Sequence, residues 1–100
     1  MWEQHIKKGI SILDSYFGPN WPERISLPDL EMGSCERCIL GQLFGSYSEG
    51  RQDLLGGSED ECIKDGFNCV PVSSTPLSLC HDRLAYEWEE AVTSLYHERY

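Results

Sequence analysis

The central segment of the chain, residues 34–47, reads SCERCILGQLFGSY and predicts one helix with two different sides. At about 100° per residue, one side is apolar and the other carries small, thiol or amide side chains. The apolar side consists of Ile39, Leu40, Leu43, Phe44 and Tyr47. The opposite side consists of Cys35, Cys38, Gly41, Gln42 and Gly45. The first side predicts burial in a core, and the second predicts close contact with a neighbour.

A first helix is predicted over residues 2–17, where apolar side chains recur at helical spacing. Either Gly9 or Ile10 supplies the middle position of its apolar face. Residues 18–20, Gly-Pro-Asn, predict the end of this helix, because glycine accepts a left-handed conformation and proline cannot continue the hydrogen-bond ladder. An irregular link follows, with one helical turn expected over residues 28–31.

The central helix is predicted to weaken at residues 48–50 and to resume over residues 51–55. Ser58 and Glu61 then form a capping-box pattern, in which side chains and backbone amides satisfy one another. This pattern predicts a short helix that ends at Gly66, because glycine is favoured just past a helix end.

The last helix is predicted to start between residues 75 and 81 and to reach residue 97, after a loop over residues 68–78. Either Ala91 or Val92 lies in its apolar stripe. These elements predict a single domain, residues 1–100, with an all-α fold: a compact bundle of four or five short helices with irregular Pro- and Gly-rich links. We expect the first and last helices to enclose the central one.

Net charge and hydropathy limit the classes of protein to which the chain can belong. The chain has 17 acidic and eight basic residues, a formal net charge of −9. Because DNA- and RNA-binding proteins need a cationic surface, we expect no direct nucleic-acid binding, and a basic partner protein fits better. No apolar run approaches the roughly 18 residues that span a bilayer, and the amino terminus lacks a signal-peptide pattern. We therefore expect a cytoplasmic protein with no membrane partner.

The five cysteines allow three interpretations. The spacing of Cys35 and Cys38 lets two thiolates reach one zinc ion. The remaining ligands could come from Cys62, Cys69, Cys80 and His81, with Cys62 and Cys69 favoured, although the later cysteines lack the tight spacing of structural zinc sites. A thiol-redox catalyst would use Cys35 at a helix start, but no βαβ pattern surrounds it. The favoured interpretation makes Cys38 a small buried hydrophobe. It predicts no metal site, no cofactor and no catalytic residue.

The core at residues 38–47 reads Cys-Ile-Leu-Gly-Gln-Leu-Phe-Gly-Ser-Tyr, with Ile-Ser-Leu at residues 25–27 before it and Gly66, Phe67 and a Trp88 helix after it. In this order the chain resembles a family of short hypothetical proteins of actinobacteria and their phages. The resemblance covers most of the chain. It implies a bacterial or phage origin and a cytosolic location, and it assigns no catalytic residue.

The function predicted from these observations is that of a small acidic, non-enzymatic interaction module, phage- or prophage-encoded, that binds a bacterial protein. Two alternatives stay open: a zinc-stabilised regulatory module that uses Cys35 and Cys38 with later cysteines, and an acidic mimic of DNA. The chain shows none of the common hydrolase, metalloprotease or nucleotide-binding motifs. A homo-oligomer is also left open. The predicted partner-contacting residues are Cys35, Gln42, Glu59, Asp60, Glu61 and Asp65.

Overall fold

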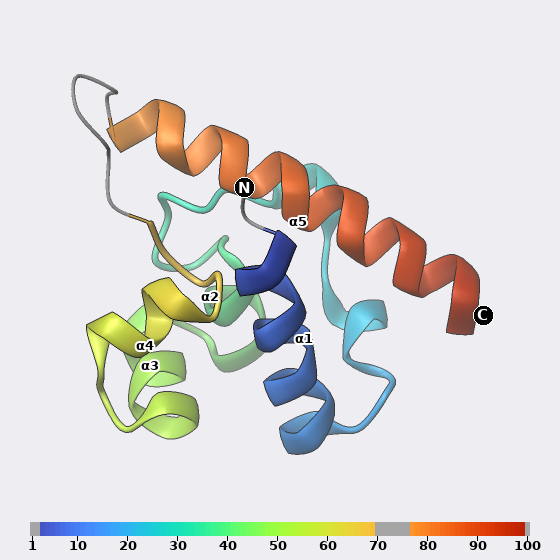
Figure 1. The fold of residues 1–100 in the computed structure, drawn as a ribbon, viewed down its shortest axis with the longest axis horizontal. Coiled ribbons are helices and arrows are strands. Elements are labelled where there is room, and N and C mark those ends of the chain that lie inside the picture. Colours follow the sequence, from blue (N-terminus) through green and yellow to red (C-terminus); the bar gives the residue numbers. More distant parts are fainter. Residues whose placement is uncertain (1–2, 70–76, 100) are drawn as a thin grey trace.

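The structure, a computed structural model, describes residues 3–69 and 77–99, and every regular element in these ranges is a helix (Figure 1). This confirms the all-α prediction. The predicted helix start at Trp2 and residues 70–76 of the predicted loop lie outside the described residues. The elements are α1 (Glu3–Phe17), η1 (Trp21–Arg24), η2 (Leu27–Asp29), α2 (Ile39–Phe44), α3 (Tyr47–Leu55), α4 (Glu59–Lys64) and α5 (Leu77–Arg99), where η marks a 3-10 helix.

The longest helix, α5, runs along one side of the molecule, and α1 packs directly against it (Figure 1). The central helix α2 instead packs on α3 and η1. The expectation that the first and last helices enclose the central one is therefore wrong. The physical reason is Gly9, because a Cβ atom built there would lie 3.2 Å from the ring of Trp88. A residue without a side chain lets α1 approach α5 directly.

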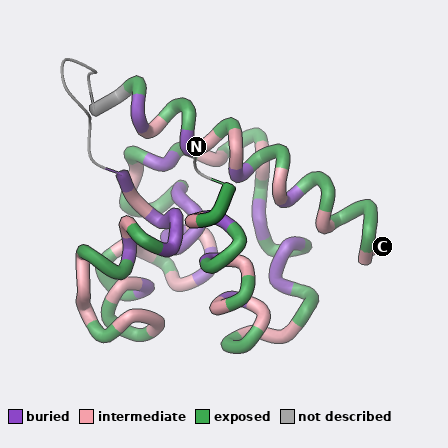
Figure 2. The backbone as a smooth tube through the Cα atoms, viewed as in Figure 1, coloured by how far each residue is buried: buried purple, intermediate pink, exposed green. Residues whose placement is uncertain are grey.

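The core is organised around Trp88, whose side chain is fully buried. Its ring stacks on Phe67 with centroids 5.8 Å apart and meets Trp21 edge-on at 6.4 Å. The indole N–H donates to the carbonyl oxygen of Gly66 at 2.6 Å, so the buried polar group is satisfied. Figure 2 shows buried positions recurring along the side of α5 that faces the rest of the chain. Residues far apart in sequence thus share one core.

The end of α1 is where the sequence predicts it. Gly18 adopts the left-handed conformation with φ +84°, and Phe17 is the last helical residue. One turn earlier, the Asp14 carboxylate accepts hydrogen bonds from the Trp21 indole at 2.7 Å and from the Arg99 guanidinium at 2.8 Å. Burial opposes ionisation of Asp14, but these donors hold its pKa below the ordinary value. The ion pair ties the last residues of α5 to the end of α1.

The predicted helix over residues 34–47 is replaced by a turn, the short helix α2 and the start of α3. Cys38 is the N-cap of α2, and its Sγ accepts from the amide of Gly41 at 3.3 Å. Gly45 ends α2 in the left-handed conformation with φ +100°, and Ser46 caps α3. The break therefore falls before the predicted weak point at residues 48–50.

The turn before α2 does not join the helix because the carbonyl groups of Cys35 and Arg37 are bonded elsewhere. The Cys35 carbonyl accepts from the amide of Tyr47 at 2.7 Å, and the Arg37 carbonyl accepts from the Gln42 side chain at 2.9 Å. The turn folds back over Gly41, where a Cβ atom would overlap the Cys35 carbonyl. The small-residue side of α2 is thus covered at Gly41 by the chain itself.

The predictions for the remaining elements are close to the structure. Ser58 caps α4 by accepting from the amide of Glu61 at 3.2 Å, which confirms the helix start, and Gly66 follows its end with φ +79°. The helical turn expected over residues 28–31 is present as η2, one residue earlier. The 3-10 helix η1, which buries Trp21, lies where the sequence predicts an irregular link.

Candidate functional site

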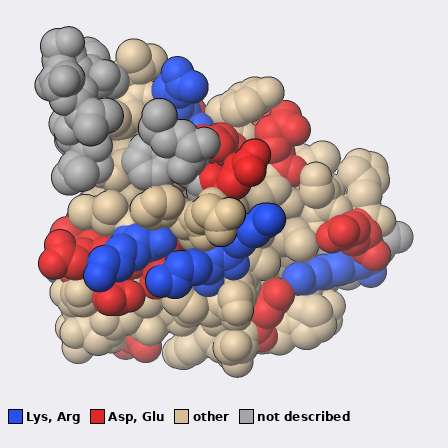
Figure 3. Space-filling view, in the orientation of Figure 1, with Lys and Arg blue, Asp and Glu red and all other residues tan. Residues whose placement is uncertain are grey.

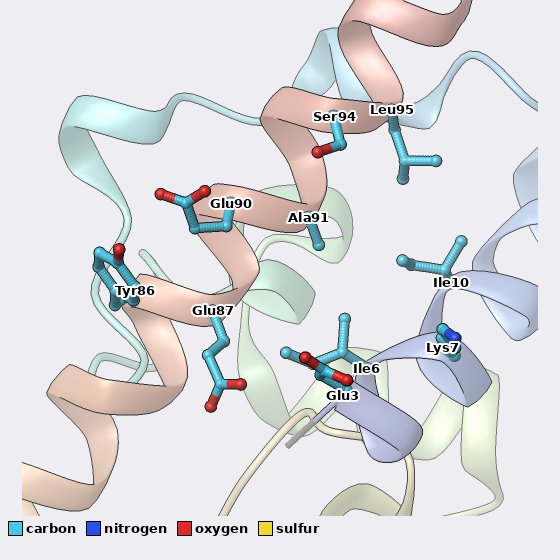
Figure 4. A pocket seen from close by; sticks show the side chains of 10 residues that line it. All are labelled: Glu3, Ile6, Lys7, Ile10, Tyr86, Glu87, Glu90, Ala91, Ser94 and Leu95. Carbon is cyan, nitrogen blue, oxygen red and sulfur yellow. The ribbon is translucent and has the colours of Figure 1, made fainter. Parts of the chain in front are cut away.

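A groove of about 720 Å³ lies between α1 and α5 (Figure 4). Its floor is apolar and comes from both helices, with Ile6 and Ile10 on α1 and Ala91 and Leu95 on α5. In Figure 4 the side chains of Ile10 and Leu95 point toward the same gap. Hollows of this size, with a mainly apolar lining, are typical of binding sites.

The rim of the groove is mainly acidic. Among the residues that line it, Glu3 of α1 and both Glu87 and Glu90 of α5 contribute carboxylates, against the one ammonium group of Lys7. Tyr86 also lines the groove, and 62% of its surface is exposed. An apolar floor beneath an acidic rim suits the apolar face of a helix that also carries Lys or Arg.

Two positions are ambiguous in the predicted apolar faces of the first and last helices, and both bear on this groove. Gly9 and Val92 turn out to be buried in the core, whereas Ile10 and Ala91 line the groove. On each helix, the apolar stripe therefore includes one residue that the core does not bury, and this residue lines the groove. Sequence reasoning missed the groove because it assigned the whole stripe to the core.

A second cluster joins α3, α4 and α5 through the side chain of Asn68. Its Nδ2 donates to Glu59 Oε1 at 2.5 Å and to the Tyr47 hydroxyl at 3.2 Å, while Tyr47 donates to the same Glu59 oxygen at 2.9 Å. Arg51 pairs with the other Glu59 oxygen at 2.7 Å. The Asn68 Oδ1 lies 3.1 Å from His81 Nε2. One amide thus connects side chains from three helices.

The charges in this cluster follow from its surroundings. Burial raises the pKa of Tyr47, and the neighbouring Cys62 and Glu59 raise it further. Burial opposes ionisation of Glu59, but hydrogen bonds from Arg51, Tyr47 and Asn68 lower its pKa overall. Tyr47 therefore stays a neutral hydroxyl donor, and Glu59 stays an anionic acceptor.

Next to this cluster lies a small pocket of about 110 Å³. Cys35, which is exposed, and His81 line it from opposite halves of the sequence. The sequence marks Cys35 and His81 as possible metal ligands but does not place Asn68 or His81 beside Cys35, because the fold alone brings these residues to one place. The lining residues are Met32, Gly33, Ser34, Cys35, Tyr47, Asn68 and His81.

The side chain of Gln42, a predicted partner-contacting residue, forms hydrogen bonds to the backbone of two other segments. Its Oε1 accepts from the amide of Ser26 at 2.6 Å, and its Nε2 donates to the carbonyls of Ser26 at 3.2 Å and Arg37 at 2.9 Å. These bonds clamp the link before η2 onto the turn before α2. Contact of Gln42 with a partner stays a prediction.

The four predicted acidic residues are not equivalent in the structure. Asp60 and Glu61 are exposed on the first turn of α4, whereas Glu59 is held in the Asn68 cluster. Asp65 is only 1% exposed, so it cannot belong to an accessible acidic patch. The structure therefore leaves Asp60, Glu61 and Cys35 as the exposed members of the predicted set.

Asp65 is a buried carboxylate at the end of α4. Neither of its oxygens has a hydrogen-bond partner among the described residues, and Lys8 Nζ lies 3.8 Å from Oδ1. Burial raises the pKa of Asp65, although the nearby Lys8 acts in the opposite direction. An ionised carboxylate in this position costs stability.

The described cysteines do not assemble into a metal site. Among the described residues, no group of three or more His, Cys, Asp or Glu side chains is arranged to hold a metal ion. All five cysteines are free thiols, and all except Cys35 are buried. Burial raises the pKa of Cys38 and Cys62, and that of Cys69 to about 11, where the adjacent Cys80 thiol adds to the effect. The zinc alternative with Cys35, Cys38, Cys62 and Cys69 finds no support here.

Comparisons with family models, curated proteins and solved structures gave no match for this chain. The fold defines the class as an all-α bundle, and the resemblance to the actinobacterial and phage family stays a prediction. Within residues 3–69 and 77–99, no helix combines the length and the apolar character needed to cross a membrane. The face in Figure 3 carries both signs of charge, with Lys and Arg in a row and acidic side chains on either side. This face does not favour the DNA-mimic alternative.

Proposed function

We propose that this protein is a small acidic, non-enzymatic interaction module, phage- or prophage-encoded, that binds a bacterial protein through the groove between α1 and α5. The observation that carries the proposal is the combination of an apolar floor and an acidic rim in that groove. The net charge of −9 favours the same kind of partner. The sequence resemblance supports the phage or bacterial origin.

The partner segment that fits the groove is an amphipathic helix with Lys or Arg beside its apolar stripe. Its apolar side chains would cover Ile10, Ala91 and Leu95, which are only partly buried, and this removes apolar surface from water. Its basic side chains would face Glu87 and Glu90 at the rim, which favours fast association and correct orientation. Both contacts come from regular helices, so the groove is formed before the partner binds.

The test uses two designed peptides of about 18 residues, long enough to form a helix. Both carry the same leucine stripe, and the remaining positions are mainly Lys in one and Glu in the other. We expect calorimetry to show binding of the Lys peptide, weaker at high ionic strength, and none of the Glu peptide. Equal binding of both peptides, or of neither, would contradict the proposal.

Two matched variants locate the contact. Ala91→Arg places a long cationic side chain in the groove, while Thr93→Arg adds the same charge at an exposed position of α5 outside the groove lining. We expect Ala91→Arg to weaken Lys-peptide binding at least tenfold, about 1.4 kcal/mol, and Thr93→Arg to weaken it much less. Binding of a bacterial protein captured from a lysate should likewise be weakened more by Ala91→Arg than by Thr93→Arg. Binding that is unaffected by Ala91→Arg would place the contact elsewhere.

A second copy of the chain is the competing occupant of the groove. Sedimentation of the protein alone distinguishes it, because self-association through the groove would be lost in Ala91→Arg. The proposal predicts a monomer that binds the Lys peptide, and a dimer abolished by Ala91→Arg would contradict it.

A further inference from the structure

Two buried thiols lie next to each other where the segment after α4 meets the start of α5. Cys69 is 2% exposed, and Cys80, in the first turn of α5, is 5% exposed. Both belong to the same hydrophobic core. The pKa of Cys69 is raised to about 11, first by burial and then by the Cys80 thiol, which lies within hydrogen-bonding reach. We call Cys69 and Cys80 the thiol pair.

Side-chain hydrogen bonds of the neighbouring residues hold the thiol pair in place. Asn68, which precedes Cys69, accepts at Oδ1 from the Cys69 amide at 2.8 Å. The same oxygen lies 3.1 Å from Nε2 of His81, which follows Cys80. The Nδ2 of Asn68 donates to Glu59, so the amide is anchored at both ends. The chain on either side of the thiol pair is thus bonded together, and the two sulfur atoms meet without a change of fold.

The thiol pair takes no part in the proposed function, because neither cysteine lines the groove. Nor does it belong to a metal site: the described part of the chain contains no group of three or more His, Cys, Asp or Glu side chains arranged around one ion. Two thiols in contact, without further ligands, are the arrangement from which a disulfide forms.

We propose that Cys69 and Cys80 are a redox-active dithiol that hydrogen peroxide converts into an intramolecular disulfide. The sulfur of one thiolate attacks a peroxide oxygen, the O–O bond breaks, and the departing hydroxide takes up the thiol proton to become water. The sulfur of the second thiol then attacks the sulfenic acid. The S–S bond forms, the S–O bond breaks, and the second thiol proton leaves in another water molecule. Two electrons pass from the dithiol to the peroxide.

Peroxide is the class of oxidant that suits a buried thiol pair. Hydrogen peroxide is little larger than water, whereas a disulfide reagent brings a bulky group to the sulfur that it modifies. Cys80 lies in the first turn of α5, and the ends of helices open locally at a lower free energy than the centre of a core does. The start of α5 therefore gives the oxidant its access.

The test uses the full chain with Cys35→Ser, which removes the exposed thiol and keeps the four buried ones. The folded protein is treated with hydrogen peroxide, and the remaining thiols are alkylated in denaturant. Trypsin then releases both members of the thiol pair in one peptide, residues 65–83, and Cys38 and Cys62 in two others. We expect the 65–83 peptide to be lighter by two hydrogen atoms and free of alkylation, while Cys38 and Cys62 are alkylated.

The disulfide should also stabilise the folded protein, because a bond between residues 69 and 80 reduces the freedom of the unfolded chain. We expect peroxide to raise the urea midpoint of the Cys35→Ser protein by about 1 to 2 M, and dithiothreitol to reverse this rise. Addition of Cys80→Ala should abolish the rise. Addition of Cys62→Ala, the matched change of a buried thiol outside the pair, should preserve it.

Two results would overturn the proposal. One is a 65–83 peptide that is alkylated at both cysteines after peroxide treatment, or that carries a sulfinic or sulfonic acid. The other is a disulfide that links this peptide to Cys38 or Cys62. Both measurements use protein with all four buried thiols, so they do not depend on the folding of an alanine variant. Either result would leave the groove proposal unaffected, because the thiol pair and the groove share no residue.

Discussion

Gly9 determines how closely α1 approaches α4 and α5. A Cβ atom at this position would overlap the backbone carbonyl oxygen of Asp65 and lie 3.2 Å from the Trp88 ring. A backbone atom cannot move aside as a flexible side chain can. The close approach therefore outweighs the roughly 1 kcal/mol by which alanine favours a helix over glycine.

We predict that Gly9→Ala lowers the free energy of unfolding by about 2 kcal/mol, because overpacking of a core displaces its neighbours. The control is Ser11→Ala at an exposed position of the same helix, which should change stability by less than about 0.5 kcal/mol. Urea unfolding measures both. Gly9→Ala with wild-type stability or greater would show that α1 does not lie this close to α4.

Asp65 makes the free energy of unfolding depend on pH, with a sign opposite to that of most carboxylates. Its pKa is raised in the folded protein, so the folded state holds the proton more tightly than the unfolded state does. Its unfavourable contribution is therefore present above the folded-state pKa and disappears as the pH falls toward the ordinary value.

We predict that Asp65→Asn raises the free energy of unfolding by about 1 kcal/mol at neutral pH, because it removes a buried charge. This gain should shrink as the pH is lowered to about 4, where Asp65 itself takes up a proton. Asp60→Asn, an exposed neighbour, should change stability by less than about 0.5 kcal/mol at both pH values. A loss of stability in Asp65→Asn at neutral pH would mean that the Lys8 ion pair outweighs burial.

The elements themselves could be predicted from the sequence, but their ends in the middle of the chain could not. The apolar repeats found α1 and α5, and the Ser58 cap found α4, because each signal is local. The segment over residues 34–47 divides because Cys38 acts as a cap and because Gln42 takes the Arg37 carbonyl. Both interactions depend on contacts that helical periodicity does not describe.

The Gln42 clamp makes this explanation testable. We predict that Gln42→Glu lowers the free energy of unfolding by about 2 kcal/mol, because a carboxylate oxygen would face the carbonyls of Ser26 and Arg37 without a donor. Gln4→Glu at an exposed position of α1 is the matched change. Equal stability of the two variants under urea would show that the clamp contributes nothing.

At the scale of the whole molecule, the fold class follows from patterning, whereas both candidate sites depend on packing. The groove exists because α1 and α5 approach each other closely at Gly9 and Trp88. The apolar side chains of Ile10 and Ala91, which the core does not bury, then line the space between the two helices. The small pocket exists because Asn68 and His81 meet near Cys35. Side chains this far apart in sequence carry no local signal of their neighbours.

The most direct test of the groove as the binding site is a nuclear magnetic resonance titration of the ¹⁵N-labelled protein with the Lys peptide. We predict saturable shift changes that centre on the amides of Ile6, Ile10, Ala91 and Leu95, with little change at Asp60. Shift changes confined to the first turn of α4, or no saturable change at the groove, would contradict the account.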